Sequence, residues 1–92
     1  MKDIDYNNTR LFVGNLPFST TGDDVYDFLR PAGVVRWVRI AAAPDGRSRG
    51  FAFVNMRTNI DAQVAIFRFD GAELAGRRLT IAFARPRSDK AA

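Results

Sequence analysis

Arg10–Leu16 (RLFVGNL) and Arg49–Met56 (RGFAFVNM) are the two stretches of this sequence that decide its fold. Both are rich in β-branched and aromatic residues, and their side chains alternate with the period of two that a strand buried on one face requires. The buried face is assigned to Leu11, Val13, Leu16, Ala52, Val54 and Met56. The opposite face is assigned to Phe12, Gly14, Arg49, Phe51, Phe53 and Asn55. Pro17 ends the first strand, because proline has no N–H to donate to a sheet.

The segments around these stretches predict two helices. Thr21 and Asp24 have the spacing of a helix N-cap and its capping partner, and Thr58 and Asp61 repeat that spacing. Apolar residues then follow at helical spacing on one face of each helix. They are Val25, Phe28 and Leu29 in the first helix, and Ala62, Ala65, Ile66 and Phe69 in the second.

Two further strands are predicted at residues 34–41 (VVRWVRIA) and 79–84 (LTIAFA). In the last strand, alternation directs Leu79, Ile81 and Phe83 inward and Thr80, Ala82 and Ala84 outward. Arg77 and Arg78, just before it, are expected to form a solvated turn.

The order of elements is β-α-β-β-α-β, which predicts an α+β sandwich of the ferredoxin-like type. In this fold a four-stranded antiparallel sheet carries both helices on one face and leaves the other face open. We expect a polar, flexible leader over residues 1–9, one domain over residues 10–85 and a short basic tail over residues 86–92.

The composition argues against most enzymes. The 92 residues include neither cysteine nor histidine, which excludes disulfides, thiolate metal sites and the commonest general base. We therefore expect no catalytic residue, no metal and no cofactor. No apolar run approaches the ~20 residues of a membrane span, and the polar N-terminus is unlike a signal peptide. A monomeric, soluble intracellular protein with no membrane partner is expected.

Charge and exposed rings favour a polyanionic partner. The formal net charge is +4, and 12 of the 14 basic residues are arginine, whose planar guanidinium binds phosphate and stacks on bases. Aromatic rings on an open face need a reason to be exposed, and here Phe12, Phe51 and Phe53 would provide flat platforms for unstacked bases. The arginines expected to reach phosphates around these rings are Arg39, Arg49 and Arg85.

Leu11–Leu16 (LFVGNL) and Arg49–Met56 resemble the paired hexamer and octamer ribonucleoprotein motifs of the RNA-recognition motif family. The octamer agrees with the family pattern at seven of eight positions, counting the free one. The resemblance covers roughly residues 10–85, and the chain is similar to the small single-domain bacterial members of that family. A fragment of a longer splicing or messenger-binding protein would look the same. Met56 replaces an aromatic residue of the pattern, but alternation directs its side chain to the core, so binding is expected to be intact.

The resemblance implies that the chain binds single-stranded RNA on the open sheet face. It implies that Phe12 and Phe53 stack on two successive bases and that Phe51 inserts between sugars. Arg49 would pair with phosphate, and Asn15 would hold either the end of the strand or a base edge. Further contacts are expected from Arg10, Arg39, Arg47, Asn55, Thr80, Ala82, Ala84, Arg85 and Arg87.

The position of Trp37 depends on a bulge. A core that contains Val35, Val38 and Ile40 requires one extra residue in the second strand, and that residue would turn Trp37 and Arg39 to the open face. There the indole would stack on a further base. The alternative is that Trp37 is buried in the core or packs beneath a loop.

Other functions stay open at this point. A protein-interaction variant of the same fold would usually lack the sheet aromatics, which are present here; a protein partner on the helical face, in addition to RNA, stays open. The stacking surface does not distinguish RNA from single-stranded DNA. Acylphosphatases share the order of elements, but their phosphate-binding loop has no counterpart in Gly14–Pro17. The expected location is the cytoplasm in a bacterium, and the nucleus or cytoplasm in a eukaryote.

Overall fold

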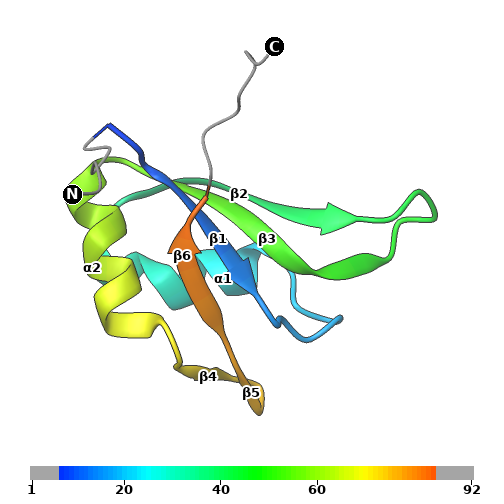
Figure 1. Ribbon diagram of the computed structural model, residues 1–92. Coiled ribbons are helices and arrows are strands. Elements are labelled where there is room, and N and C mark those ends of the chain that lie inside the picture. The colour runs from blue at the N-terminus through cyan, green and yellow to red at the C-terminus, as the bar shows by residue number, and fades with distance from the viewer. Residues whose placement is uncertain (1–6, 85–92) are drawn as a thin grey trace, which may run out of the picture.

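The chain folds in the predicted β-α-β-β-α-β order, with one short hairpin added before the last strand (Figure 1). The computed structural model describes residues 7–84. Most of the expected leader, the basic tail, Arg85 and Arg87 therefore lie outside the described residues. The elements are β1 (Arg10–Gly14), α1 (Gly22–Leu29), a 3-10 helix η1 (Arg30–Ala32), β2 (Val35–Ala42), β3 (Ser48–Met56), α2 (Asn59–Phe69), β4 (Glu73–Leu74), β5 (Arg77–Arg78) and β6 (Thr80–Phe83).

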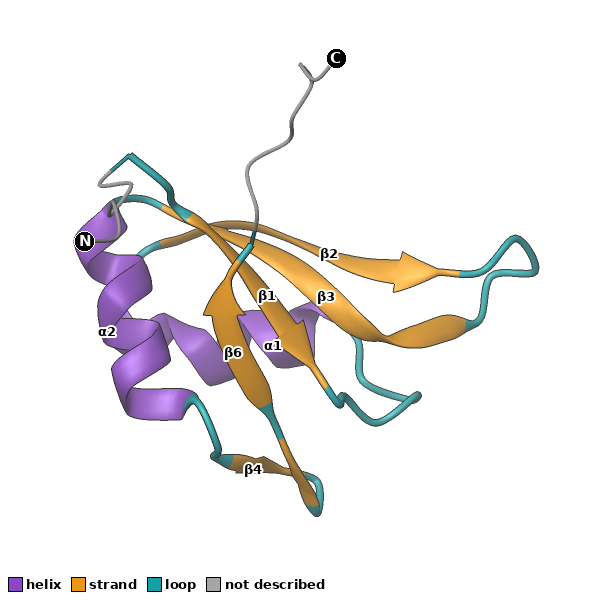
Figure 2. Ribbon diagram, in the orientation of Figure 1, coloured by secondary structure: helices purple, strands orange, loops and turns teal. Residues whose placement is uncertain are grey.

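Four of the strands form one antiparallel sheet in the order β2-β3-β1-β6. The two strands that carry the quoted motifs, β1 and β3, are its central pair. Both helices lie on one side of this sheet, and no helix of the described residues lies on the other side (Figure 2). This arrangement confirms the predicted α+β, ferredoxin-like fold.

Both helices begin where the threonine spacing predicts. The Thr21 hydroxyl accepts from the Asp24 N–H at 3.1 Å, and the Asp24 carboxylate accepts from the Thr21 N–H at 3.0 Å, which completes a capping box. Thr58 caps α2 in the same way through the Asp61 N–H at 3.0 Å. The Asp61 carboxylate instead accepts from the Val34 N–H at 3.3 Å, so it joins α2 to the start of β2.

The core lies between the helices and the inward face of the sheet. All six residues that alternation assigned to the buried face of β1 and β3 are at most 2% exposed. They pack against Val25 and Leu29 of α1 and Ala62 and Ala65 of α2, which are also buried. The predicted alternation of these central strands is therefore confirmed. Met56 is fully buried, as expected.

The last strand departs from prediction at its end. Phe83 shares a face with its partner Leu11, yet it stays 37% exposed because β6 is an edge strand with a neighbour on one side only. Ala84, expected to face outward, is 5% exposed. The strand stops at Phe83, and the chain around Asn8 covers Ala84: the Ala84 N–H donates to the Arg10 carbonyl at 3.0 Å, and its carbonyl accepts from Asn8 Nδ2 at 2.9 Å.

The β4–β5 hairpin was not predicted. Arg77 and Arg78, expected to form a solvated turn, pair with Leu74 and Glu73 as a short two-stranded sheet. Both arginines are nevertheless exposed. The hairpin is too short to show the alternation that marks longer strands.

Candidate functional site

Three phenylalanine rings form a cluster on the face of the sheet that no helix covers. Phe12 stands directly opposite Phe53, and Phe51 stands opposite Gly14, so all four residues share this face. The ring centroids are 5.5 Å apart for Phe12 and Phe51, 6.1 Å for Phe12 and Phe53, and 5.9 Å for Phe51 and Phe53. Each ring is half-buried, and within residues 7–84 none is sealed beneath another element. We call Phe12, Phe51 and Phe53 the aromatic cluster.

Gly14 sets the position of one ring in this cluster. A Cβ atom at Gly14 would lie 2.7 Å from Cε2 of Phe12, which is closer than real side chains approach. The absence of a side chain therefore lets the Phe12 ring lie flat over the end of β1. The glycine of the hexamer motif is thus explained by packing against the ring.

Two guanidinium groups lie over the aromatic cluster. Cζ of Arg10 is 5.1 Å from the centre of the Phe53 ring, and Cζ of Arg49 is 5.5 Å from the centre of the Phe51 ring. Each is within the range of a cation–π contact, worth ~0.5–1 kcal/mol at an exposed site. Within residues 7–84, neither guanidinium forms an ion pair with an acidic side chain. Both positive charges are therefore available to an anion.

Trp37 extends the aromatic surface onto the edge strand β2. The pairing of β2 with β3 shifts between Val35 and Trp37, which is the predicted bulge. After the shift, Trp37 stands opposite Asn55 and Arg39 stands opposite Phe53, so both face the open side. The indole is 36% exposed, with Cζ of Arg39 at 5.4 Å from its ring. The open-face placement of Trp37 is confirmed, and burial in the core is wrong.

The asparagines that alternation and the motifs singled out have partners inside the protein. Asn55 Oδ1 accepts from the Thr9 hydroxyl at 2.6 Å. Asn15 Nδ2 donates to the Arg78 carbonyl at 2.8 Å, and Arg77 donates back to the side chain of Asn15. Two roles were expected for Asn15, to hold the end of the strand or to contact a base edge. These hydrogen bonds support the first role.

The remaining residues expected to contact RNA differ in how far the structure exposes them. Thr80 and Ala82 stand opposite Gly14 and Phe12 and are exposed on the open face. Arg47 is exposed in the loop between β2 and β3, where it pairs with Asp45 at 3.5 Å. Ala84 is buried with both backbone groups bonded internally, so the structure does not present it to a ligand.

Phe18 is an exposed ring that sequence reasoning did not single out. It lies in the loop after β1 and is 74% exposed. Alternation offers no signal in a loop, so the residue could have been noticed only as an apolar side chain placed among turn-forming residues.

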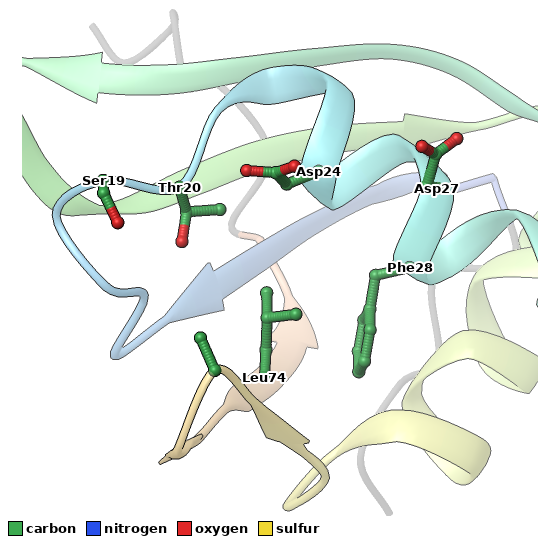
Figure 3. Close-up of a pocket in the computed structure, with 7 residues that line it drawn as sticks. Ser19, Thr20, Asp24, Asp27, Phe28 and Leu74 are labelled. Atoms are coloured by element: carbon green, nitrogen blue, oxygen red, sulfur yellow. The ribbon is translucent and has the colours of Figure 1, made fainter.

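A hollow of about 440 Å³ lies on the helical side, between α1 and the β4–β5 hairpin (Figure 3). Asp24 and Asp27 project from α1 at its rim, and Phe28 and Leu74 face each other below them. Asp24 belongs to the capping box, and Asp27 lies 3.9 Å from Arg30. Both carboxylates therefore have a partner within or next to α1, and the capping role of Asp24 is the one that the sequence predicts.

The part of the chain that the structure describes contains no group of three or more side chains suited to hold a metal ion. Over the same residues, no helix is long and apolar enough to cross a bilayer.

Comparison with known proteins gives consistent matches. A family model described as RNA recognition motif matches residues 11–80. The RNA-binding protein RbpE of Nostoc sp. is 41% identical over 83 residues, which are 89% of this chain and 84% of RbpE. The chloroplastic 33 kDa ribonucleoprotein of Nicotiana sylvestris is 44% identical over 75 residues, which are 80% of this chain and 23% of that protein.

Among solved structures, a complex of the Sxl-lethal protein with RNA superposes with a TM-score of 0.82 at 34% identity. The region of similarity covers 87% of this chain and 48% of the chain in that complex. The chain therefore spans most of RbpE, about half of the chain in the complex and about a quarter of the chloroplast protein.

Proposed function

Because this chain belongs to the RNA recognition motif family, we propose that it binds single-stranded RNA on the open face of its sheet. The relatives support this class of ligand, since RbpE is named as an RNA-binding protein and the Sxl-lethal structure is a complex with RNA. The proposal assigns the bases to the aromatic cluster and the phosphates to the arginines around it.

The observation that carries the proposal is the aromatic cluster on an uncovered sheet. Three rings within 6.1 Å of one another would normally be buried, and here each stays partly exposed on the side of the sheet opposite the helices. Stacking of an unpaired base on such a ring contributes ~1–3 kcal/mol. Phe12 and Phe53 are proposed to stack on successive bases, with Phe51 against the sugars between them. Trp37 adds a further platform on β2.

The arginines supply the charge that a phosphate backbone needs. Arg10 and Arg49 lie over the rings themselves, so a base that stacks there must displace each guanidinium group, which can then pair with the phosphates of the bound strand. A guanidinium forms two parallel hydrogen bonds with phosphate, which fixes orientation as well as charge. With two or three stacked bases and few phosphate contacts, we expect affinity of about micromolar or weaker.

Titration of labelled RNA pools by fluorescence anisotropy tests the proposal. Phe51→Ala and Phe53→Ala should each weaken binding by ~1–3 kcal/mol. Phe67→Ala is the matched control, because this ring is 89% exposed on α2, on the opposite side of the sheet. Thermal unfolding of each variant checks that the fold persists. Equal affinity of both sheet variants and the wild type would contradict the site.

A parallel titration with DNA of the same random composition separates RNA from single-stranded DNA. Stacking alone is shared by both, whereas contacts to the 2′-hydroxyl favour RNA. We propose a preference for RNA and a binding role without catalysis. A protein partner on the helical face is a further proposal. The apolar contact with it would come from Phe67 and Ile60, which are 89% and 68% exposed on α2.

A further inference from the structure

The hollow between α1 and the β4–β5 hairpin has the features of a binding groove (Figure 3). Its floor is apolar, because Phe28 of α1 and Leu74 of β4 face each other there, and its rim carries the carboxylates of Asp24 and Asp27. Its volume of about 440 Å³ lies within the ~300–1,000 Å³ typical of sites that enclose a ligand. We call these four residues and the space between them the α1 groove.

Both apolar walls of the α1 groove are held in place by the protein itself. The Phe28 ring packs against the Phe69 ring of α2, with 5.0 Å between the ring centroids. Leu74 is paired with Arg77 across the hairpin, and the Arg77 guanidinium donates to Oδ1 of Asn15 at 2.6 Å. Both Phe28 and Leu74 are half-buried, so part of each side chain remains free for a further apolar contact. The groove is therefore formed before any ligand arrives.

Asp27 lies where its charge opposes the helix that carries it. It is two residues before the end of α1 at Leu29, where the helix dipole is negative and a carboxylate is unfavourable. Its ion pair with Arg30, at 3.9 Å, joins side chains that are 75% and 63% exposed, and such pairs contribute little to stability. Neither the dipole nor this ion pair explains an acidic side chain here, whereas a cationic ligand in the groove would use its charge.

The charge around the α1 groove differs in sign from that of the open face. Within its bounds α1 has three acidic residues, Asp23, Asp24 and Asp27, and no basic residue. The chain as a whole has a net charge of +4, and Arg10 and Arg49 lie over the aromatic cluster on the opposite side of the sheet. A phosphate backbone is therefore repelled from the α1 groove, and a cationic segment is attracted to it.

We propose that the α1 groove binds a short segment of a partner protein in which an aliphatic or aromatic side chain is next to an arginine or lysine. The apolar side chain inserts between Phe28 and Leu74, and the cation pairs with Asp27 at the rim. The chain's own residues 85–92 (RPRSDKAA) have the cations but no apolar side chain larger than proline, so they would leave the apolar floor unfilled. The inference deepens the proposed partner on the helical face, and it does not require RNA.

Selection from a displayed library of random heptapeptides, with the full chain as bait, identifies the preferred segment. We expect the selected peptides to combine a large apolar residue with an arginine or lysine, and to shift the backbone amide resonances of α1 and the β4–β5 hairpin. Their binding should weaken as the salt concentration rises, because exposed charges are screened. A library that yields no binder, or binders that are acidic or that shift only the open face of the sheet, would overturn the proposal.

Substitutions at the rim and at the floor test the two halves of the groove separately. Asp27→Lys should weaken binding of the selected peptides about 5-fold or more, yet α1 should lose no stability, because the change favours the helix dipole and places a cation four residues after Asp23. Leu74→Thr should also cost about 5-fold or more, because it removes apolar surface but keeps a residue suited to a strand. Asp45→Lys is the control: it makes the same change of net charge in the β2–β3 loop, outside the groove. Thermal unfolding checks that each variant is folded.

The outcomes separate this proposal from RNA binding. RNA affinity is measured on the same wild-type protein, and its absence would overturn the proposed function alone. If Asp27→Lys and Leu74→Thr bind the selected peptides as the wild type does, the α1 groove is wrong, and a loss in Phe67→Ala would then assign the partner to the outer face of α2. Sedimentation that shows a wild-type dimer, dissociated by Asp27→Lys, would make a second copy the occupant and would also overturn the proposal.

Discussion

The side chains of Asn15 and Arg77 are hydrogen-bonded to each other at the end of β1. Nη2 of Arg77 donates to Oδ1 of Asn15 at 2.6 Å, and Nε of Arg77 donates to the Asn15 carbonyl at 3.2 Å. Asn15 Nδ2 in turn donates to the Arg78 carbonyl at 2.8 Å. Three hydrogen bonds therefore join the first strand to the β4–β5 hairpin, which lies 62 residues away along the chain.

We predict that Asn15 acts mainly on stability. Its φ of 64° is left-handed, a conformation that costs a residue such as alanine ~1–2 kcal/mol. Asn15→Ala should therefore lower the free energy of unfolding by ~1–3 kcal/mol, since it also loses the side-chain hydrogen bonds. Asn15→Gly should lose less, because glycine adopts this φ freely. Urea denaturation measures both.

RNA titration decides the alternative role of Asn15. If the side chain contacts a base edge, Asn15→Gly will weaken RNA binding even where the protein is fully folded. If it only holds the strand's end, affinity will match the wild type under the same conditions. We expect the second result.

The phosphate role of Arg49 predicts a change in salt dependence. Binding of single-stranded RNA should weaken with salt, with a log–log slope of about −0.7 for each phosphate contacted. Arg49→Gln should make the slope shallower by about 0.7, because it removes one such contact. Arg68→Gln is a suitable control, since Arg68 lies on α2 and donates to the Pro31 carbonyl on the helical side. A flat response in the wild type would contradict phosphate binding by these arginines.

The central strands show which features a sequence can predict. Alternation assigned both faces of β1 and β3 correctly, because each strand has neighbours on two sides and a core on one. The bulge before Trp37 was also predictable, since only an extra residue could keep Val35 and Val38 on the core side. In these places the local pattern and the tertiary environment impose the same arrangement.

Prediction failed where the environment depends on distant segments. Ala84 is buried by the chain around Asn8, and the Arg77–Asn15 contact joins two turns that have no common motif. Phe18 is an exposed ring that lies close to Gly50 at one edge, a relationship that no spacing reveals. The orientation of side chains in the central strands was therefore predictable, whereas contacts in loops and at chain crossings required the structure.

Trp37 provides an intrinsic reporter of binding. It is the only tryptophan in the chain, and it lies on the open face opposite Asn55. If a base stacks on the indole, its emission should change on addition of RNA and saturate with the anisotropy signal. Trp37→Ala should weaken binding by ~1–3 kcal/mol, and Trp37→Phe should recover part of the loss. Unchanged emission at saturating RNA would exclude Trp37 from the site.

Met56 tests whether the motif or the face of the sheet determines binding. The family pattern has an aromatic residue here, but the Met56 side chain is fully buried on the helix-covered face, opposite Val35. Met56→Phe restores the pattern, yet it should leave RNA affinity unchanged because the new ring cannot reach the open face. Its larger, stiffer side chain should instead alter stability, with overpacking that costs ~1–3 kcal/mol.

Urea denaturation and RNA titration of Met56→Phe measure the two quantities separately, and Phe53→Ala gives the opposite result: weaker binding with a smaller effect on the fold. The comparison is sharp because the two positions are three residues apart on one strand, and alternation alone places them on opposite faces. Tighter RNA binding by folded Met56→Phe would mean that this position influences the open face through the sheet, and the separation of the two faces would then be wrong.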